Sequence, residues 1–177
     1  MPVYSLGAKE PRIHPTALVA PSATIIGDVV VGPRTSIWPG AVLRGDYGRI
    51  RIGENCSIQD NVTVHCAADN AGVVGNGVTV AHNAIIHACR IGDECLIGAG
   101  AIIFDGARVG KHSIIGVGTV VLEGRKIPAR SVAVGVPAKV VRRTTDADIR
   151  MIKDSYKAYV KMARRYVETG AFKKPIV

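Results

Sequence analysis

The sequence predicts an all-β solenoid, a parallel β-helix of six-residue repeats, followed by one C-terminal α-helix. Aliphatic residues recur at every sixth position over most of the chain, glycine often follows them, and a helical pattern of apolar residues occupies only the last part. A period of six fits neither a simple strand, which repeats every two residues, nor a helix, which repeats every 3.6. Three such hexads make one triangular coil of a parallel β-helix.

The aliphatic series runs along the chain with three breaks. A three-residue insertion lies around 46–48, a four-residue insertion lies within 66–72, and one residue is missing before Ile91. An ordinary β-sandwich would need all of these in-phase repeats to be accidental. We therefore expect a solenoid from about Ile13 to Ile127, in which each coil contacts only its neighbours. The stacked residues are Ile13, Val19, Ile25, Val31, Ile37, Leu43, Ile52, Ile58, Val64, Val74, Val80, Ile86, Ile91, Ile97, Ile103, Val109, Ile115, Val121 and Ile127.

Glycine follows many of these aliphatic residues, as a tight corner would require. These glycines are Gly32, Gly53, Gly75, Gly92, Gly98, Gly110 and Gly116.

The last part of the chain is predicted to form one amphipathic helix. Thr144 and Thr145 precede acidic residues and offer an N-cap, and Gly170 is the expected end. The apolar stripe needs a surface to cover, most simply the side of the solenoid or a neighbouring subunit. Residues 1–143 are expected to form the solenoid, with a short lead-in and an extended closing linker over 127–137, and residues 144–177 the helical segment. The stripe comprises Ile149, Ile152, Tyr156, Tyr159, Val160, Ala163 and Val167.

Composition indicates one cytoplasmic domain of 177 residues. The sequence shows neither a signal peptide nor an apolar run long enough to span a membrane. The four cysteines lack CxxC spacing and are expected to be reduced packing residues. The net charge of +9 lies largely on the predicted helix and its flanks. A solvated helix face therefore explains it better than a nucleic-acid surface, and we expect neither a nucleic acid nor a membrane as partner.

Three histidines fall at defined positions of the repeat. His65 follows Val64 and His87 follows Ile86, and these two aliphatic residues are three hexads apart. His65 and His87 should therefore stack in adjacent coils, at the strand spacing of about 4.8 Å. Arg44 lies one further coil below in the same column. Two imidazoles this close can share one metal ion.

His82 belongs to the preceding hexad and so to another face of the triangle, as does Gln59. It should reach the His65–His87 pair only from a neighbouring subunit. Phase counting thus predicts a homotrimer with metal sites at its interfaces, each built from His65 and His87 of one chain and His82 of the next. Three neutral imidazoles leave one position open on a tetrahedral Zn²⁺, as a catalytic site requires. Imidazole also suits Fe²⁺ and Co²⁺.

The chain resembles the left-handed β-helix proteins of the hexapeptide-transferase superfamily. At the segments Arg44-Gly45-Asp46, Gln59-Asp60, His65 and 82–87 it is similar to γ-class carbonic anhydrases, and in particular to a short-loop subgroup also described as ferripyochelin-binding-like. The resemblance implies left-handed coils, reversible hydration of CO₂ by metal-bound hydroxide, and His65, His82 and His87 as the metal ligands.

The resemblance also assigns the residues around the metal. Gln59 matches a glutamine that bonds the bound hydroxide or orients CO₂. Arg44 and Asp46 match a pair that ties subunits together and supports the site, and Asp60 matches a second carboxylate. Tyr159 falls where the family's C-terminal helix reaches the site with an asparagine, although an aromatic on the apolar helix stripe would face the solenoid.

The chain departs from the best-studied branch of that family. Tyr47 replaces a glutamate after the Arg-x-Asp motif, Ser57 replaces an asparagine, and the loop over 66–72 lacks the acidic proton-shuttle residue. Two other functions therefore stay open. One is a hexapeptide acyltransferase or coenzyme A thioester hydrolase, which would need one histidine as general base. The other is a metal-binding scaffold with little catalysis.

Overall fold

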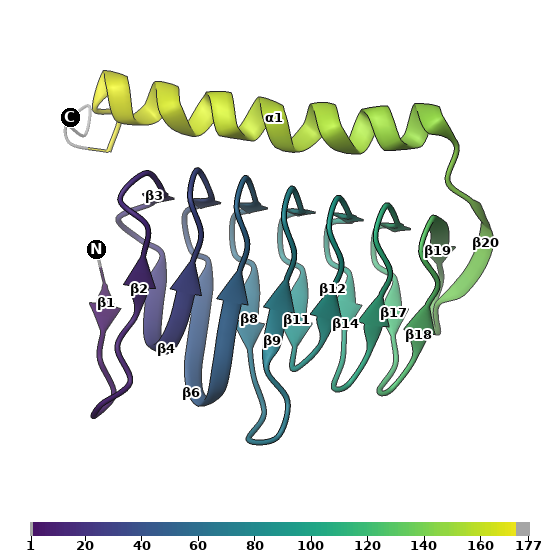
Figure 1. Ribbon diagram of the computed structural model, residues 1–177, viewed down its shortest axis with the longest axis horizontal. Helices are drawn as coiled ribbons and strands as arrows, with labels where there is room; N and C mark the ends of the chain where they lie inside the picture. The colour runs from purple at the N-terminus through teal and green to yellow at the C-terminus, as the bar shows by residue number, and fades with distance from the viewer. Residues whose placement is uncertain (1, 173–177) are drawn as a thin grey trace.

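The computed structural model describes residues 2–172, which form a left-handed parallel β-helix with one long α-helix along its side (Figure 1). The front strands run upward and the rear strands run downward while the coils advance from left to right (Figure 1). The predicted fold class is confirmed.

The solenoid has three faces, which the chain visits in turn. Two long strands, β4 (Thr24–Val31) and β6 (Val42–Ile52), each bend from the third face onto the first. The first, or front, face continues with β2 (Arg12–Ile13), β9 (Gly72–Val74), β12 (Arg90–Ile91), β15 (Arg108–Val109) and β18 (Lys126–Ile127). The second, or helix, face comprises β3 (Leu18–Val19), β5 (Ser36–Ile37), β7 (Ser57–Ile58), β10 (Thr79–Val80), β13 (Leu96–Ile97), β16 (Ile114–Ile115) and β19 (Ser131–Val134). The third, or histidine, face comprises β1 (Val3–Tyr4), β8 (Thr63–His65), β11 (Ile85–His87), β14 (Ile102–Ile103) and β17 (Val120–Val121), besides the first parts of β4 and β6.

The strand register follows the hexad count. Val80 pairs with Ile58 on one side and Ile97 on the other, and Ile86 pairs with Val64 and Ile103. The paired aliphatic side chains stack inside the triangle, and all six of these are fully buried. Removing this apolar surface from water, at about 25 cal/mol per Å², is the main force holding the coils together.

The glycines that follow the aliphatic residues are explained by coil stacking. A Cβ on Gly32 would lie 2.7 Å from the carbonyl carbon of Gly53 in the next coil, and a Cβ on Gly98 would lie 2.5 Å from the backbone nitrogen of Val117. The expected reason, a tight turn, is therefore incomplete, because successive corners approach too closely for any side chain.

The end of the solenoid differs from the prediction. Within the expected linker over 127–137, β19 forms a further helix-face strand, since Val132 and Ala133 pair in parallel with Ile114 and Ile115. β20 (Lys139–Arg143) then turns back and pairs antiparallel with β19. Pro128 and Pro137 flank this strand without preventing it, because neither lies inside it.

Helix α1 (Asp146–Thr169) begins with a capping box, in which the Thr145 side chain and Asp148 bond each other's backbone N–H. It ends at Gly170, whose φ of 64° is left-handed. The helix lies along the helix face and contacts β3, β5, β7 and β10 (Figure 1). Within residues 2–172, this helix does not have the length and apolarity needed to cross a membrane.

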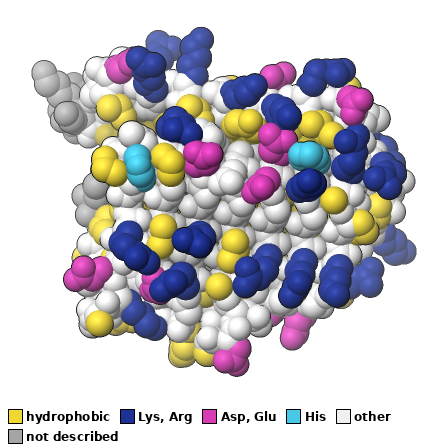
Figure 2. Space-filling model, viewed as in Figure 1, with side chains coloured by type: hydrophobic (Ala, Val, Ile, Leu, Met, Phe, Trp, Pro, Cys, Tyr) yellow, Lys and Arg dark blue, Asp and Glu magenta, His cyan; other side chains and the backbone are white. Residues whose placement is uncertain are grey.

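Positive charge is not confined to the helix. Arg90, Arg108 and Lys126 occupy paired positions on β12, β15 and β18, and all three are exposed. Figure 2 shows Lys and Arg side chains both on the helix and across the face below it. The predicted helix and its flanks therefore account for only part of the net charge, and the solenoid strands supply another part.

The four cysteines are free and buried. Burial raises the pKa of Cys56, Cys89 and Cys95 to about 12. They are therefore packing residues, as expected, and poor nucleophiles at neutral pH.

Candidate metal centre

His65 and His87 lie side by side on the histidine face. They are register partners in β8 and β11, and Arg44 pairs with His65 on the other side, as the hexad count predicts. Nδ1 of His65 lies 3.0 Å from Nε2 of His87. Two nitrogens at 2.0–2.1 Å from one tetrahedral metal ion would lie roughly 3.3 Å apart, so the pair has nearly the spacing that a shared ion needs.

Each of these two rings has a carboxylate on its other nitrogen. Nε2 of His65 lies 2.8 Å from Oδ1 of Asp46, and Nδ1 of His87 bonds Oδ1 of Asp105. A carboxylate can only accept, so the ring nitrogen that faces it carries the proton. In the neutral rings, the two nitrogens that face each other are therefore both lone pairs. Two lone pairs that face each other repel unless a cation lies between them. The two nitrogens are therefore suited to bind a metal ion together.

His82 lies elsewhere in the same chain. It occupies the corner between β10 and β11, where its Nδ1 is 3.0 Å from Oδ2 of Asp60, and its side chain is half exposed. A turn at His82 and Asn83, with Asn83 in the left-handed region, separates His82 from β11, which carries His87. Among residues 2–172 of one chain, no three His, Cys, Asp or Glu side chains gather around one point. One chain therefore supplies two converging ligands.

All three histidines thus have a carboxylate partner: Asp46, Asp60 and Asp105. Metal-binding histidines usually donate their outer N–H to such a group, which fixes the tautomer and leaves the other nitrogen free. Sequence reasoning missed Asp105. The signal was available, because Ile103 pairs with Ile86, and this register places Phe104 and Asp105 beside His87.

Comparison with known proteins identifies the family. The chain is 44% identical over 174 residues to a carbonic anhydrase of Geobacillus kaustophilus, covering 98% of this chain and 92% of the relative. The chain belongs to the γ-class carbonic anhydrase family. It is 41% identical over 162 residues, 88% of its length, to the mitochondrial γ carbonic anhydrase 2 of Arabidopsis thaliana. It spans 58% of the length of that plant protein and 62% of the plant's γ carbonic anhydrase 1.

The family's repeat and fold are found as well. Residues 10–45 match the profile of the bacterial transferase hexapeptide (six repeats). A crystal structure of a candidate acetyltransferase from Bacillus cereus superposes with a TM-score of 0.91 at 39% identity, covering 93% of this chain and 95% of that chain.

Asp46 occupies the centre of a small network beside His65. It pairs with Arg44, and its Oδ1 accepts the backbone N–H of Tyr47 at 3.0 Å. The ring of Tyr47 stands edge-on to His65 with 6.3 Å between centroids. Burial raises the pKa of Asp46, but the hydrogen bonds from His65, Tyr47 and Arg44 outweigh it and lower the value from 3.8 to about 2.

This shift predicts how Asp46 contributes to stability as pH changes. A carboxyl whose folded pKa is lowered stabilises the fold above its unfolded pKa and loses that contribution as pH falls through the folded pKa. We expect Asp46→Asn to melt at a lower temperature than the parent above about pH 4, with the difference shrinking between pH 4 and pH 2. Melting curves of both proteins across this range check it. A constant difference down to pH 2 would contradict the assignment.

Of the other predicted site residues, Gln59 lies near His82 and the ring of Tyr159 lies under helix α1. Gln59 is 3% exposed and follows β7, next to Asp60, so it lies near His82 and not beside the His65–His87 pair of its own chain. Tyr159 packs edge-on against Trp38 under the helix, with 5.9 Å between centroids. The structure therefore supports the alternative interpretation of Tyr159, an aromatic of the helix stripe that faces the solenoid.

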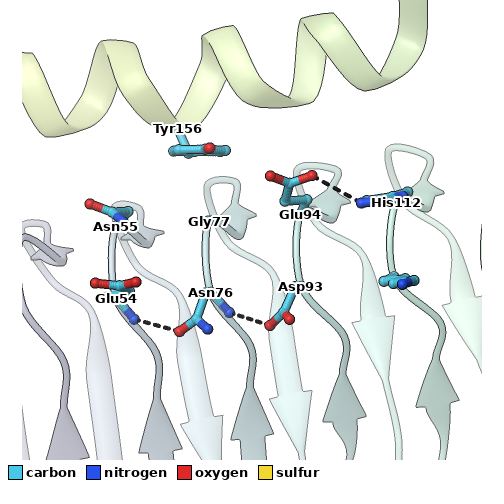
Figure 3. Close-up of a pocket in the computed structure, with 9 residues that line it drawn as sticks. Glu54, Asn55, Asn76, Gly77, Asp93, Glu94, His112 and Tyr156 are labelled. Atoms are coloured by element: carbon cyan, nitrogen blue, oxygen red, sulfur yellow. Dashed lines mark hydrogen bonds and ion pairs between the residues drawn. The ribbon is translucent and has the colours of Figure 1, made fainter. Parts of the chain in front are cut away.

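A separate polar pocket of about 360 Å³ lies between α1 and the corner that joins the front and helix faces (Figure 3). Its acidic residues already have partners. Glu94 pairs with His112 at 2.9 Å, and Asp93 accepts the backbone N–H of Asn76 at 2.7 Å (Figure 3). Glu94 also pairs with Lys153 at 3.4 Å. These contacts fix the corners of the solenoid, and none of the predicted site residues lines the pocket.

Proposed function

We propose that this protein is a carbonic anhydrase that interconverts CO₂ and bicarbonate at metal sites shared between the subunits of a homotrimer. Each site would take His65 and His87 from one chain and His82 from the next, with Zn²⁺ as the metal and Fe²⁺ or Co²⁺ as alternatives.

The observation that carries this proposal is the pair of histidine nitrogens 3.0 Å apart, each on a ring whose other nitrogen faces a carboxylate. His82 has the same carboxylate arrangement but lies on another corner of its own chain. Only a second chain can add it to the pair. The histidine face is free to receive one, since α1 covers the helix face, and Phe104 and Leu122 on the histidine face are 45% and 49% exposed.

The side chains around the pair have distinct roles in this proposal. A divalent cation held there lowers the pKa of water and supplies a nucleophile for CO₂ near neutral pH. Asp46 holds the proton on Nε2 of His65, and Arg44 neutralises and orients Asp46. Asp60 holds the proton on Nδ1 of His82 in the same way. Gln59 would enter the site beside His82 of the partner subunit and hydrogen-bond the substrate.

An acyltransferase or coenzyme A thioester hydrolase is the second candidate, and the similarity to the B. cereus candidate acetyltransferase favours it. That chemistry needs one histidine as general base, whereas this chain carries three with anchored tautomers. A rise in melting temperature on adding coenzyme A would support the second candidate, and no change would favour the first.

The test is metal analysis together with CO₂ hydration. Protein purified without oxygen should hold about one Zn²⁺ or Fe²⁺ per chain, and chelation should remove hydration activity that the same metal restores. Metal without hydration would refute the carbonic anhydrase assignment and leave a metal-binding scaffold or a thioester hydrolase. Careful preparations without any metal would refute the shared site.

A further inference from the structure

We propose that Asp105 is a positioning residue of the metal centre, which fixes the tautomer and direction of His87. Its neighbour Phe104 fixes the plane of the same ring. The inference rests on the proposed function, because it assigns Asp105 a purpose only if His87 binds metal.

The hydrogen bond between Asp105 and His87 determines which nitrogen can bind. Oδ1 of Asp105 accepts from Nδ1 of His87, so the proton stays on Nδ1 and Nε2 keeps its lone pair. That Nε2 is the atom that faces His65 at 3.0 Å. In the other tautomer, an N–H on Nε2 would point at the place where the metal must lie and block it. Asp105 therefore excludes the tautomer that cannot coordinate.

Phe104 restrains the ring in a second direction. Its ring stacks on His87 with 5.2 Å between centroids and 19° between planes. Phe104 directly follows Ile103, the register partner of Ile86, so the contact is set by the pairing of β14 with β11. The imidazole is thus held at its edge by Asp105 and on its face by Phe104, and little rotation is left to it.

Asp105 has no other evident use in the fold. Among residues 2–172, its carboxylate forms an ion pair with His87 alone, and its side chain is 25% exposed. Asp28 provides a contrast. It is similarly exposed, at 22%, but pairs with Arg49 at 2.8 Å, and neither of them contacts a histidine. Loss of the Asp28 carboxylate should therefore leave metal binding unchanged, which makes Asp28→Asn a matched control.

The experiment compares zinc affinity in the whole protein and its variants. Chelated samples of the parent, Asp105→Asn, Asp105→Glu and Asp28→Asn are titrated with Zn²⁺ against a competing coloured chelator, and with Co²⁺ to record the ligand-field spectrum. Asp105→Asn should raise the zinc dissociation constant about 10- to 100-fold and change the Co²⁺ spectrum. Asp105→Glu keeps the carboxylate acceptor but displaces it. Its zinc affinity should therefore lie between those of the parent and Asp105→Asn. Asp28→Asn should match the parent.

The outcomes separate this inference from the proposed function. Parent affinity and an unchanged Co²⁺ spectrum in both Asp105 variants would overturn the role of Asp105 and leave the shared site standing. An equal loss in Asp28→Asn would also overturn it, since the effect would then come from charge alone. Melting curves of the metal-free samples check folding, and if Asp105→Asn does not fold, Asp105→Glu decides. A parent that binds no Zn²⁺ would refute both proposals.

Discussion

Replacing His82 with alanine is expected to remove metal binding and CO₂ hydration, although His82 does not approach His65 or His87 in its own chain. The loss should exceed about 100-fold, because removing a carboxylate behind a metal-binding histidine already costs about 10- to 100-fold. The fold should survive, since the His82 side chain is half exposed and its main partner is Asp60. Metal content, hydration rate and melting temperature of the purified variant measure the effect.

His112→Ala is the control for this variant. His112 also lies at a corner and pairs with a carboxylate, Glu94 at 2.9 Å, but it belongs to the pocket beneath α1. Its removal should leave metal content and hydration unchanged. Full metal content in His82→Ala, or equal losses in the two variants, would contradict the proposed ligand set.

The largest effect on stability is expected from the stacked aliphatic core. Ile115 is fully buried between Ile97 and Ala133 of the adjacent coils, whereas Ile114, next to it in β16, is only partly buried. Ile115→Ala should lower the free energy of unfolding by about 2–5 kcal/mol, because it removes buried methyl groups and leaves a cavity. For a chain of this size that corresponds to a fall in melting temperature of roughly 4–20 °C.

Ile114→Ala removes the same atoms from a partly exposed position. It should therefore lower the free energy of unfolding clearly less than Ile115→Ala does. Both variants must be melted at one protein concentration, since the stability of an oligomer depends on it. Equal losses at the two positions would contradict the inward and outward alternation on which the register depends.

Much of the fold could be predicted because the six-residue repeat assigns each residue to one face of a triangular coil. Val64 and Ile86 are three hexads apart, and this alone places His65 beside His87. The count does not depend on propensity or on long-range packing, so insertions at the corners leave it intact. The helix and its cap at Thr145 could be predicted for a similar reason, since capping is a local interaction.

What escaped prediction depends on contacts between coils and on side-chain direction. Asp105 has no motif of its own, and its contact with His87 becomes evident only when the hexad count is extended from Ile86 to Ile103, its partner in the pairing of β11 with β14. The closing strand β19 was missed because prolines on both sides suggest an extended linker. Tyr159 did not escape in this way, because its contact with Trp38 is the one expected of an aromatic on the predicted apolar helix stripe.

Mixed trimers decide whether each metal site is shared between two subunits. His65→Ala chains and His82→Ala chains, each inactive alone, are co-expressed in equal amounts and purified through one tag that both chains carry, so that all random trimers are retained. A site is complete when a His82→Ala chain supplies His65 and His87 and a His65→Ala chain supplies His82. For random trimers this holds at one half times one half, or about a quarter, of the sites. We predict that the mixture regains about a quarter of the parent's metal content and hydration activity. A mixture as inactive as its components would contradict a site shared between subunits.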